Sequence, residues 1–525
     1  MFHRSARGLL GATALGLLAL AVPACDGKRT SATVGGSPAA ATPPKGPLAD
    51  WDGVAAALIL TGQQDGYLEP CGCSEGQKGG MARRLDLLKK LEARGWPLVR
   101  LDLGSLIHDP ADARGGAEEE RIKLGIALKA LNVMKYDAVA LSADDLKVGI
   151  DKAIGEYLNV GERPKVVAAN VVPASGLESV VARAVRVKAG PIRVGVTAVL
   201  DPAAFAALND PNKEMLAVKG ADEALKATLK DLENDTDFQV LLVQEAPPAT
   251  LDLPGRAPKK AAALAKAFPG FDVVVATSDV PDPEREPSWV NGGKTMLVQV
   301  GRKGQYVGVV GLGADRKAKP RYRLVELDLS YDKKTEPLRA LVDEDFQALL
   351  KEAGVVEDFP KHAFVDGAPG STFVGALACK ECHEKTYFKW VSTKHARAFD
   401  ALTADRRRDR RFDAECIACH ATGLEYTTGY RSEALTPYLK GNQCENCHGP
   451  GSKHSAAPDD ASFRKAVALT PERAERTTCL KCHDADNSPH FKFPEYFDKI
   501  RHKGLDTYDD PKVHKGIDPK AFAKP

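Results

Sequence analysis

The sequence predicts two unlike parts: an α/β sandwich in the middle of the chain, followed by a mostly α-helical and irregular domain. Short apolar runs alternate with helical patterns over residues 54–330, which is typical of α/β folds. From residue 371 onward both periodicities weaken, and four copies of Cys-x-x-Cys-His crowd into this last part. A chain of 525 residues is long enough for two or three such domains.

The N-terminus has the pattern of an export signal. Arg4 and Arg7 precede an uncharged apolar stretch from Gly8 to Val22, which is shorter than the roughly 20 residues of a membrane-spanning helix. The Val-Pro-Ala-Cys that ends at Cys25 resembles a bacterial lipobox, which implies lipidation of that cysteine; ordinary cleavage and an uncleaved anchor are the alternatives. We therefore expect a lipoprotein signal peptide at residues 1–25. The protein is then exported to the periplasm or cell envelope and is held at a membrane by a lipid anchor.

The composition of the chain predicts a linker and argues against a nucleic-acid partner. Residues 26–50 are rich in Ser, Thr, Ala, Gly and Pro without an apolar period, which predicts a flexible linker. The 73 Lys and Arg against 71 Asp and Glu leave a net charge of +2. Because no basic stripe with interleaved aromatic residues is present, we expect no nucleic-acid partner.

Apolar runs between residues 51 and 330 predict the strands of the sandwich, and runs of helical spacing, such as Gly80 to Arg94 and Ala221 to Asn234, predict helices between them. The expected strands are Val54–Leu60, Pro97–Leu103, Asp137–Leu141, Lys165–Val171, Ile192–Val199, Phe238–Val243, Phe271–Ala276, Thr295–Val300, Tyr306–Leu312 and Tyr322–Leu329.

These segments resemble the metallophosphoesterase domain of periplasmic 5′-nucleotidases. The similarity rests on LILTGQQDG at the end of the first strand, LDLG, YDAVAL, AANVV, FDVVVA and VQVGRKGQYVG. It implies a metallophosphoesterase-like sandwich. Members of that family hydrolyse phosphate esters with two metal ions held by Asp, His and Asn on the loops after the strands.

The loops that carry metal ligands in that family have other residues here, and His108 is the only histidine between Trp51 and Lys361. The replacements are Gln63-Gln64-Asp65, Gly104-Ser105, Ser142-Ala143-Asp144-Asp145, Gln244 and Thr277-Ser278-Asp279-Val280. A dinuclear site of this type requires imidazole ligands, so we expect a catalytically inactive domain used for docking or ligand binding. A metal-dependent phosphoesterase is an alternative, since Asp65, Asp144, Asp145 and Asp279 are ligands for hard cations, although solvated carboxylates are the simpler interpretation.

A Cys-Gly-Cys pair, Cys71 and Cys73, follows the first strand within PCGCSEGQKGGMARR. It resembles the insertion in haem-linked, nucleotidase-like bacterial proteins. Such a close pair forms only a small, strained disulfide, or it binds a soft metal with help from elsewhere. A redox-active or metal-linked dithiol and a simple loop staple are both compatible with it.

Residues 331–370 are expected to form a connector, with a helix at Leu338 to Ala353 and a Pro- and Gly-marked boundary after it. Residues 371–525 hold the four motifs. Cys-x-x-Cys-His is the attachment signature of c-type haem: the two thiols form thioether bonds to the haem, and the adjoining imidazole binds its iron. The predicted attachment residues are Cys379, Cys382, Cys416, Cys419, Cys444, Cys447, Cys479 and Cys482, and the proximal ligands are His383, His420, His448 and His483. We therefore expect four covalently bound c-type haems.

Zinc is the main alternative for four Cys-x-x-Cys pairs. Zinc ribbons have no need of a histidine after each second cysteine, and histidine accounts for only 12 of 525 residues. The motifs therefore favour haem.

The residues around the motifs resemble those of the tetrahaem cytochrome c five-five-four family. The matching segments are CKECH with a following SxxHA-like stretch, CIACHATG, CENCHGPGSKH, and CLKCH with FKFPEYFDKIRH. The resemblance implies electron transfer between periplasmic redox partner proteins, and it favours His395, His454 and His502 as second axial ligands. The fourth second ligand is His490 or His514, or else that haem is five-coordinate.

Two functions follow from that last choice. Four bis-histidine haems make an electron carrier. One open iron position favours a haem enzyme that acts on nitric oxide, nitrite or hydroxylamine.

Overall fold

The computed structural model describes residues 48–70, 77–245, 258–280, 282–315, 318–404 and 407–505. The chain divides into two units, residues 1–50 and residues 51–525, and all helices and strands of the described residues lie in the second. The predicted signal peptide and Cys25 lie outside the described residues. Among the residues that are described, no helix is both long and apolar enough to cross a bilayer.

The first sheet has six strands in the order β14-β13-β1-β2-β3-β4. Its parallel part consists of β1 to β4, and β13 joins it antiparallel to β1 and pairs with β14 on its other side. The bounds are β1 Ala56–Thr61, β2 Leu98–Asp102, β3 Ala138–Ala140, β4 Lys165–Val167, β13 Tyr306–Leu312 and β14 Arg321–Glu326.

The second sheet also has six strands, in the order β11-β12-β10-β9-β7-β6. Its four central strands are parallel, and β6 and β11 pair antiparallel at its edges. The bounds are β6 Val185–Ala189, β7 Ile192–Val199, β9 Phe238–Val243, β10 Val273–Ala276, β11 Ser288–Val290 and β12 Thr295–Gln299. A separate two-stranded ribbon pairs β5 (Val171–Pro173) with β8 (Leu216–Val218).

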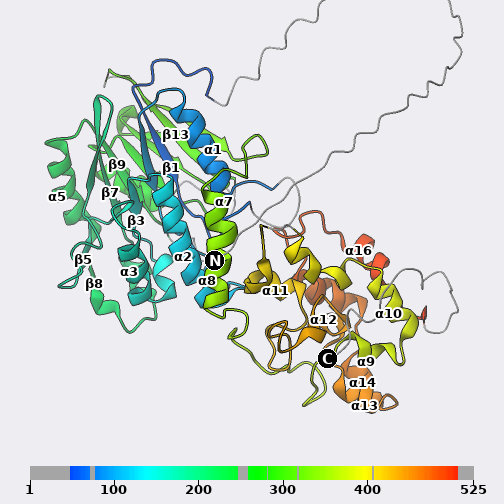
Figure 1. The fold of residues 1–525 in the computed structure, drawn as a ribbon. Coiled ribbons are helices and arrows are strands. Elements are labelled where there is room, and N and C mark those ends of the chain that lie inside the picture. The colour runs from blue at the N-terminus through cyan, green and yellow to red at the C-terminus, as the bar shows by residue number, and fades with distance from the viewer. Residues whose placement is uncertain are drawn as a thin grey trace, which may run out of the picture. The chain divides into compact units, whose positions relative to one another are not determined.

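The two sheets face each other across an apolar core, in which Leu58 and Leu101 of the first sheet meet Val194 and Val240 of the second. Helices cover the outer faces, so the layers run helix, sheet, sheet, helix (Figure 1). On the second sheet, helices α5 (Ala221–Glu233) and α6 (Lys259–Ala267) bury Leu225 and Leu264. On the first sheet lie α1 (Met81–Glu92), α2 (Gly116–Val133) and α3 (Ile150–Asn159), and a short α4 spans Pro202–Ala207. We call this part, Ala56 to Glu326, the sandwich.

The sandwich confirms the predicted α/β fold class, since most predicted strands form within two residues of their expected bounds. One predicted strand was wrong: Lys165–Val171 is divided between β4 and β5. The backbone N–H groups of Ala168 and Ala169 turn to the carbonyls of Ala182 and Ala198, at 2.9 and 2.8 Å, so the chain leaves the first sheet there. Residues 166–171 are buried on both sides of that change of direction, so the mostly apolar run resembled one continuous strand.

After the sandwich, α7 (Leu338–Ala340), a wide turn at Leu341–Asp345 and α8 (Phe346–Glu352) follow one another directly. The described residues from 371 onward, which we call the C-terminal region, contain only short helices and loops, as predicted for the mostly α-helical and irregular part (Figure 1). They are α9 Ala376–Lys380, α10 Glu384–Val391, α11 Ala414–His420, α12 Cys444–His448, α13 Ser452–Ala456, α14 Ala461–Ala466, α15 Pro471–Arg473 and α16 Phe493–Ile500.

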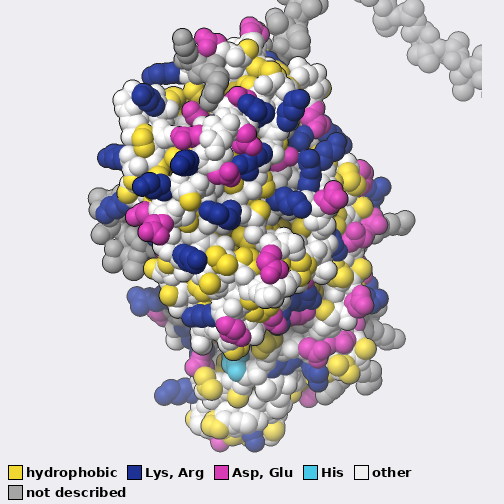
Figure 2. Space-filling view, turned by 90° about the vertical axis from the view of Figure 1, so that its left-hand side faces the viewer, with side chains coloured by type: hydrophobic (Ala, Val, Ile, Leu, Met, Phe, Trp, Pro, Cys, Tyr) yellow, Lys and Arg dark blue, Asp and Glu magenta, His cyan; other side chains and the backbone are white. Residues whose placement is uncertain are grey.

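On the face drawn in Figure 2, basic and acidic side chains are intermixed, and apolar side chains are scattered between them. This mixture agrees with the small net charge of +2.

Candidate functional site

All four Cys-x-x-Cys-His motifs form short helical turns. Motif two lies on α11, motif three is α12, and motif four begins with the turn Cys479–Lys481. In motifs one and four the histidine N–H donates to the carbonyl of the first cysteine, at 2.9 Å in both cases. The eight motif cysteines are free thiols, the form that thioether attachment requires.

Three motif histidines each face one of the three histidines predicted as second ligands. The ring centres lie 6.3 Å apart for His383 and His454, 6.1 Å for His395 and His483, and 5.8 Å for His448 and His502. The residues of each pair are far apart in sequence, so the fold brings them together.

These separations suit one metal ion between two imidazoles. A first-row metal binds an imidazole nitrogen at about 2.0 Å, and the ring centre lies roughly 1.1 Å further away, so two axial rings on one metal have centres about 6 Å apart. The buried Nδ1 of His454 also has no hydrogen-bond partner among the described residues, which leaves it available to a metal. The residues present therefore fit haem iron with two axial histidines.

Hydrogen bonds orient several of these rings. Nδ1 of His448 lies 2.8 Å from the carbonyl of Val467, and Nδ1 of His483 lies 3.0 Å from Oγ of Ser488. Such contacts at Nδ1 leave Nε2 for a metal. Burial lowers the pKa of His395, His448, His454 and His483, which favours the neutral ring that binds metals.

His420 of motif two differs from the other three. Its Nδ1 contacts the carbonyl of Ala398, yet among the described residues no histidine ring stands opposite it at a comparable distance. His490 is exposed, and His514 lies outside the described residues.

The motif thiols also show which motifs are neighbours. Cys379 of motif one forms a side-chain hydrogen bond with Cys444 of motif three, and Cys419 of motif two forms one with Cys482 of motif four. Cys479 of motif four is close enough to Cys447 of motif three to raise its pKa further, after burial. The spatial order is therefore one, three, four, two.

Hydrogen bonds between their own residues close the loops that carry Gln63, Gln244 and Ser278 at the strand ends of the sandwich. Gln63 donates from Nε2 to the carbonyl of Ser278 at 2.8 Å and accepts from the Ser278 N–H, which joins the edges of the two sheets. Gln244, in place of a histidine, donates to the carbonyl of Leu103. The side-chain amides bond to backbone groups and do not converge on a common point.

The remaining loop residues are paired as well. The Ser105 hydroxyl contacts Ser142 Oγ at 3.1 Å and donates to Asp144 at 3.0 Å, and Arg302 forms an ion pair with Asp65 at 3.0 Å. The guanidinium of Arg302 thus occupies the place beside the Asp65 carboxylate where a metal ion would have to bind. Among the described residues, the only group of three or more potential metal ligands lies elsewhere, at Glu119, Asp413 and Glu415. These loops therefore do not fit a dinuclear metal centre.

Asp145 is fully buried beside these loops. Its Oδ1 accepts from the N–H groups of Leu106 and Ile107, at 2.6 and 3.3 Å, and Tyr157 lies 3.5 Å from its Oδ2. Burial raises the pKa of Asp145 to about 8, with a smaller contribution from Asp144. Its proton is therefore retained at neutral pH, and a protonated carboxyl is a poor cation ligand.

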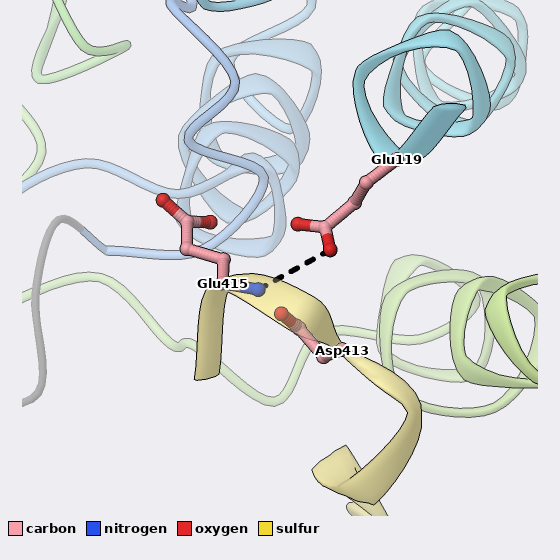
Figure 3. Close-up of side chains that lie close together, drawn as sticks. All are labelled: Glu119, Asp413 and Glu415. Carbon is pink, nitrogen blue, oxygen red and sulfur yellow. Dashed lines mark hydrogen bonds between the residues drawn. The ribbon is translucent and has the colours of Figure 1, made fainter. Parts of the chain in front are cut away.

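Sequence reasoning missed a contact between α2 of the sandwich and motif two. Glu119 accepts from the N–H of Ala414 at 2.9 Å and of Glu415 at 3.3 Å, at the start of α11 (Figure 3). Lys123 lies 2.8 Å from Glu415. The only signal in the sequence is the acidic run Glu118-Glu119-Glu120 at a helix start, which is ordinary for a solvated helix.

Cys71 and Cys73 lie outside the described residues. The described residues on either side contact the C-terminal region: Glu69 forms ion pairs with Arg408 and Arg410, and Gln77 donates to the carbonyl of Asp486 at 3.0 Å.

Comparisons with known proteins match both parts of the chain. Residues 378–449 match the family described as "Cytochrome c554 and c-prime". Cytochrome c-554 of Nitrosomonas europaea is 30% identical over 120 residues, which is 20% of this chain and 51% of that protein. The chain thus spans about half the length of that relative.

The solved structures that resemble the chain have low sequence identity. A 5′-nucleotidase precursor from Thermus thermophilus is 18% identical with a TM-score of 0.45, over 59% of this chain and 60% of that one. The calcineurin-like phosphoesterase YfkN from Bacillus subtilis is 18% identical with a TM-score of 0.44, over 57% of this chain and 98% of that one. Residues 378–449 are therefore similar to cytochromes of the c554 type, which supports a multihaem cytochrome role for this part of the chain.

Proposed function

We propose that this protein is an exported multihaem c-type cytochrome that carries electrons between redox partner proteins. The observation that carries the proposal is the set of three facing histidine pairs, at 5.8 to 6.3 Å between ring centres. Residues 371–525 hold four haems through the eight motif cysteines, and residues 331–370 connect them to the front domain, residues 51–330. The bound haem supplies one-electron chemistry, while the protein sets its axial ligands, burial and surroundings.

The proposed axial pairs are His383 with His454, His448 with His502 and His483 with His395. Two imidazoles on each iron make these three haems low-spin and closed to small ligands. The contacts between motif thiols support a relay in the order one, three, four, two.

A second candidate function rests on His420. No described imidazole faces this ring, so the second position of a haem held by His420 would be taken by His490 or His514, or would stay open. An open position would let a small nitrogen compound such as nitric oxide, nitrite or hydroxylamine bind, which is the haem-enzyme alternative.

An optical redox titration, combined with carbon monoxide addition to the reduced protein, tests both functions. We expect four haems per chain, of which one binds carbon monoxide. A preparation without a Soret band overturns the cytochrome function. If all four haems are low-spin and none binds carbon monoxide, the result supports the electron carrier and contradicts the haem enzyme.

The sandwich is proposed to be inactive as a phosphoesterase. The amide, hydroxyl and guanidinium groups in its former metal-site loops support this, because they are bonded to one another. The test is hydrolysis of nucleotides and of p-nitrophenyl phosphate with added Mg²⁺, Mn²⁺ or Zn²⁺. Turnover that a chelator abolishes contradicts the proposal.

Export and anchoring remain proposals from the sequence: a signal peptide at residues 1–25, lipid on Cys25 and a tether at residues 26–50. Mass spectrometry of the N-terminal peptide from the membrane fraction tests them. The expected result is a lipidated cysteine as first residue, and Cys25→Ala should release the protein from the membrane.

A redox role for Cys71 and Cys73 is proposed because both flanks of their loop contact residues near motifs two and four. The double variant Cys71→Ser, Cys73→Ser should change the rate at which the haems are reduced. An unchanged rate of haem reduction would leave the two cysteines with only a structural role, as a cross-link.

A further inference from the structure

We infer that the sandwich acts on the C-terminal region of its own chain: Arg114 and Glu119 position motif two and set the reduction equilibrium of the haem that it holds. This inference rests on the proposed function, and it gives the inactive front domain a task that needs no external ligand. Both are positioning residues, since they act through the polypeptide and the charge around the motif.

First, the sandwich forms hydrogen bonds with the start of α11, the helix that carries motif two. Glu119 is fully buried, and one of its oxygens accepts from two N–H groups in the first turn of α11. Asp413, the N-cap of α11, accepts from the N–H of Cys416 at 3.0 Å. Together they satisfy three of the N–H groups that a helix start leaves unpaired, and one of the two acceptors comes from the sandwich.

The second step is charge. The carboxylates of Glu119, Asp413 and Glu415 converge in Figure 3, which suggests a cation site at first sight. Lys123, only 4% exposed, already supplies the cation: its Nζ lies 3.0 Å from Glu119, 2.8 Å from Glu120 and 2.8 Å from Glu415. The cluster is therefore an ionic contact between Lys123 of the sandwich and Glu415 of α11, while burial, followed by Asp413, raises the pKa of Glu119 to about 8.

The third step is Arg114, which precedes α2. Its guanidinium lies 3.9 Å from the Sγ of Cys419 and forms an ion pair with Asp484, the residue after the motif-four histidine. One side chain of the sandwich thus contacts the attachment residue of motif two and the flank of motif four. These are the two motifs whose thiols Cys419 and Cys482 touch.

The sign of the effect follows from electrostatics. Reduction adds one negative charge to a haem, so a nearby cation stabilises the reduced form. The other charged groups around motif two are Asp413, Lys123 with Glu119, Glu120 and Glu415, and Arg410, which lies 4.0 Å from Cys416 Sγ and pairs with Glu69. Loss of Arg114 removes the cation that pairs with Asp484, although Asp486 and Asn487 still donate to this carboxylate, and it makes reduction of the motif-two haem less favourable.

The test is a redox titration of the haem-loaded full chain with Arg114→Gln, in which the carbon monoxide-binding haem is followed separately. The expected result is a reduction equilibrium about fivefold less favourable for this haem. A smaller shift is expected at one low-spin haem, that of motif four. Arg114→Lys should restore most of the equilibrium, because it keeps the charge.

The matched control is Arg186→Gln. Arg186 is also an arginine in surface ion pairs, with Asp231 and Asp235, but it lies on β6 of the second sheet. Its loss should leave every haem unchanged. If Arg114→Gln changes the reduction equilibrium of no haem, or of all four haems equally, the electrostatic part of the inference is wrong. If the purified protein contains no haem, the proposed function itself is wrong.

Glu119 is tested by a spectroscopic signature. Glu119→Ala removes the acceptor at the start of α11 and should broaden or shift the high-spin signal of the motif-two haem, with the low-spin signals unchanged. Glu119→Gln keeps an oxygen acceptor and should restore the signal. If the alanine variant fails to fold, the glutamine variant and the Arg114 pair still decide the question, and an unaltered high-spin signal in a folded alanine variant overturns the hold on α11.

Discussion

In the proposed cytochrome, single histidine side chains would determine whether each haem iron is open to a further ligand. His454 comes from α13, reaches the ring of His383 across 71 residues of sequence, and has a buried Nδ1 without a hydrogen-bond partner in the described structure. Since a second imidazole closes an iron to gases, the removal of one ring converts an electron-carrying haem into a gas-binding one.

His454→Ala is therefore expected to add one carbon monoxide-binding haem to the reduced protein and to convert one low-spin haem to high-spin. His362→Ala is the matched control, because His362 is exposed and its ring packs against Tyr426. Optical titration with the gas gives the stoichiometry. An unchanged stoichiometry in His454→Ala contradicts the proposed pairing with His383.

Because the pKa of Asp145 is raised, we expect the free energy of unfolding to depend on pH. Its folded-state pKa of about 8 exceeds its ordinary value of 3.8, so the folded chain keeps a proton that the unfolded chain has lost over this window. The stability contributed by this group is complete below about pH 4 and is lost as the pH rises through about 8. Thermal unfolding at pH 5, 7 and 9 should show a shallower decline in Asp145→Asn, which carries no proton to lose. An identical slope in the two proteins contradicts the protonated assignment.

Helices and strands were predictable to different degrees in the two parts of the chain. Ile192–Val199, Phe238–Val243 and Tyr306–Leu312 form as predicted, because a strand buried between two layers is mostly apolar along its length. Helix α10 ends at Val391. Beyond it His395 faces His483, and this tertiary requirement outweighs local helical spacing.

Glu445 shows how one motif helix is fixed in its surroundings. Its carboxylate, almost completely buried on α12, accepts from the N–H groups of Val374, Gly375 and Gly451, at 3.0, 2.7 and 2.8 Å. Burial raises its pKa, and these three N–H groups partly offset the effect.

Glu445→Ala leaves three backbone N–H groups without their acceptor and should lower the free energy of unfolding by about 2–4 kcal/mol. Denaturant titration of the haem-loaded protein measures this change. Glu384→Ala is the control, because Glu384 is exposed at the start of α10 and its loss should cost under about 0.5 kcal/mol. Equal effects of the two substitutions contradict the role of Glu445.

For the molecule as a whole, sequence motifs predicted what each part contains but not how the parts meet. The proposed attachment residues rest on the spacing of four motifs, and the proposed second ligands rest on resemblance to a family. Glu119 and Lys123 were unpredictable, because their acidic and basic pattern suits a solvated helix and only the tertiary fold buries them against α11. The same fold places Arg114 beside Cys419 across 305 residues of sequence.

The buried contact between α2 and α11 predicts that the two parts unfold together. The Soret band follows the C-terminal region, and far-ultraviolet circular dichroism is dominated by the sandwich, so their thermal midpoints should coincide in the native protein. Glu119→Ala should separate them, whereas Arg186→Gln should not. Two separate midpoints in the native protein contradict this coupling.

The position of Glu119 against the first turn of α11 also constrains the order of biogenesis. The enzymes that join porphyrin to protein must reach Cys416 and Cys419, and these cysteines follow directly on a turn that the sandwich covers once folded. Thioether formation at this motif must therefore precede closure of the sandwich over it. A chain that folds too early is expected to emerge from the maturation machinery lacking one cofactor, the one bound by His420.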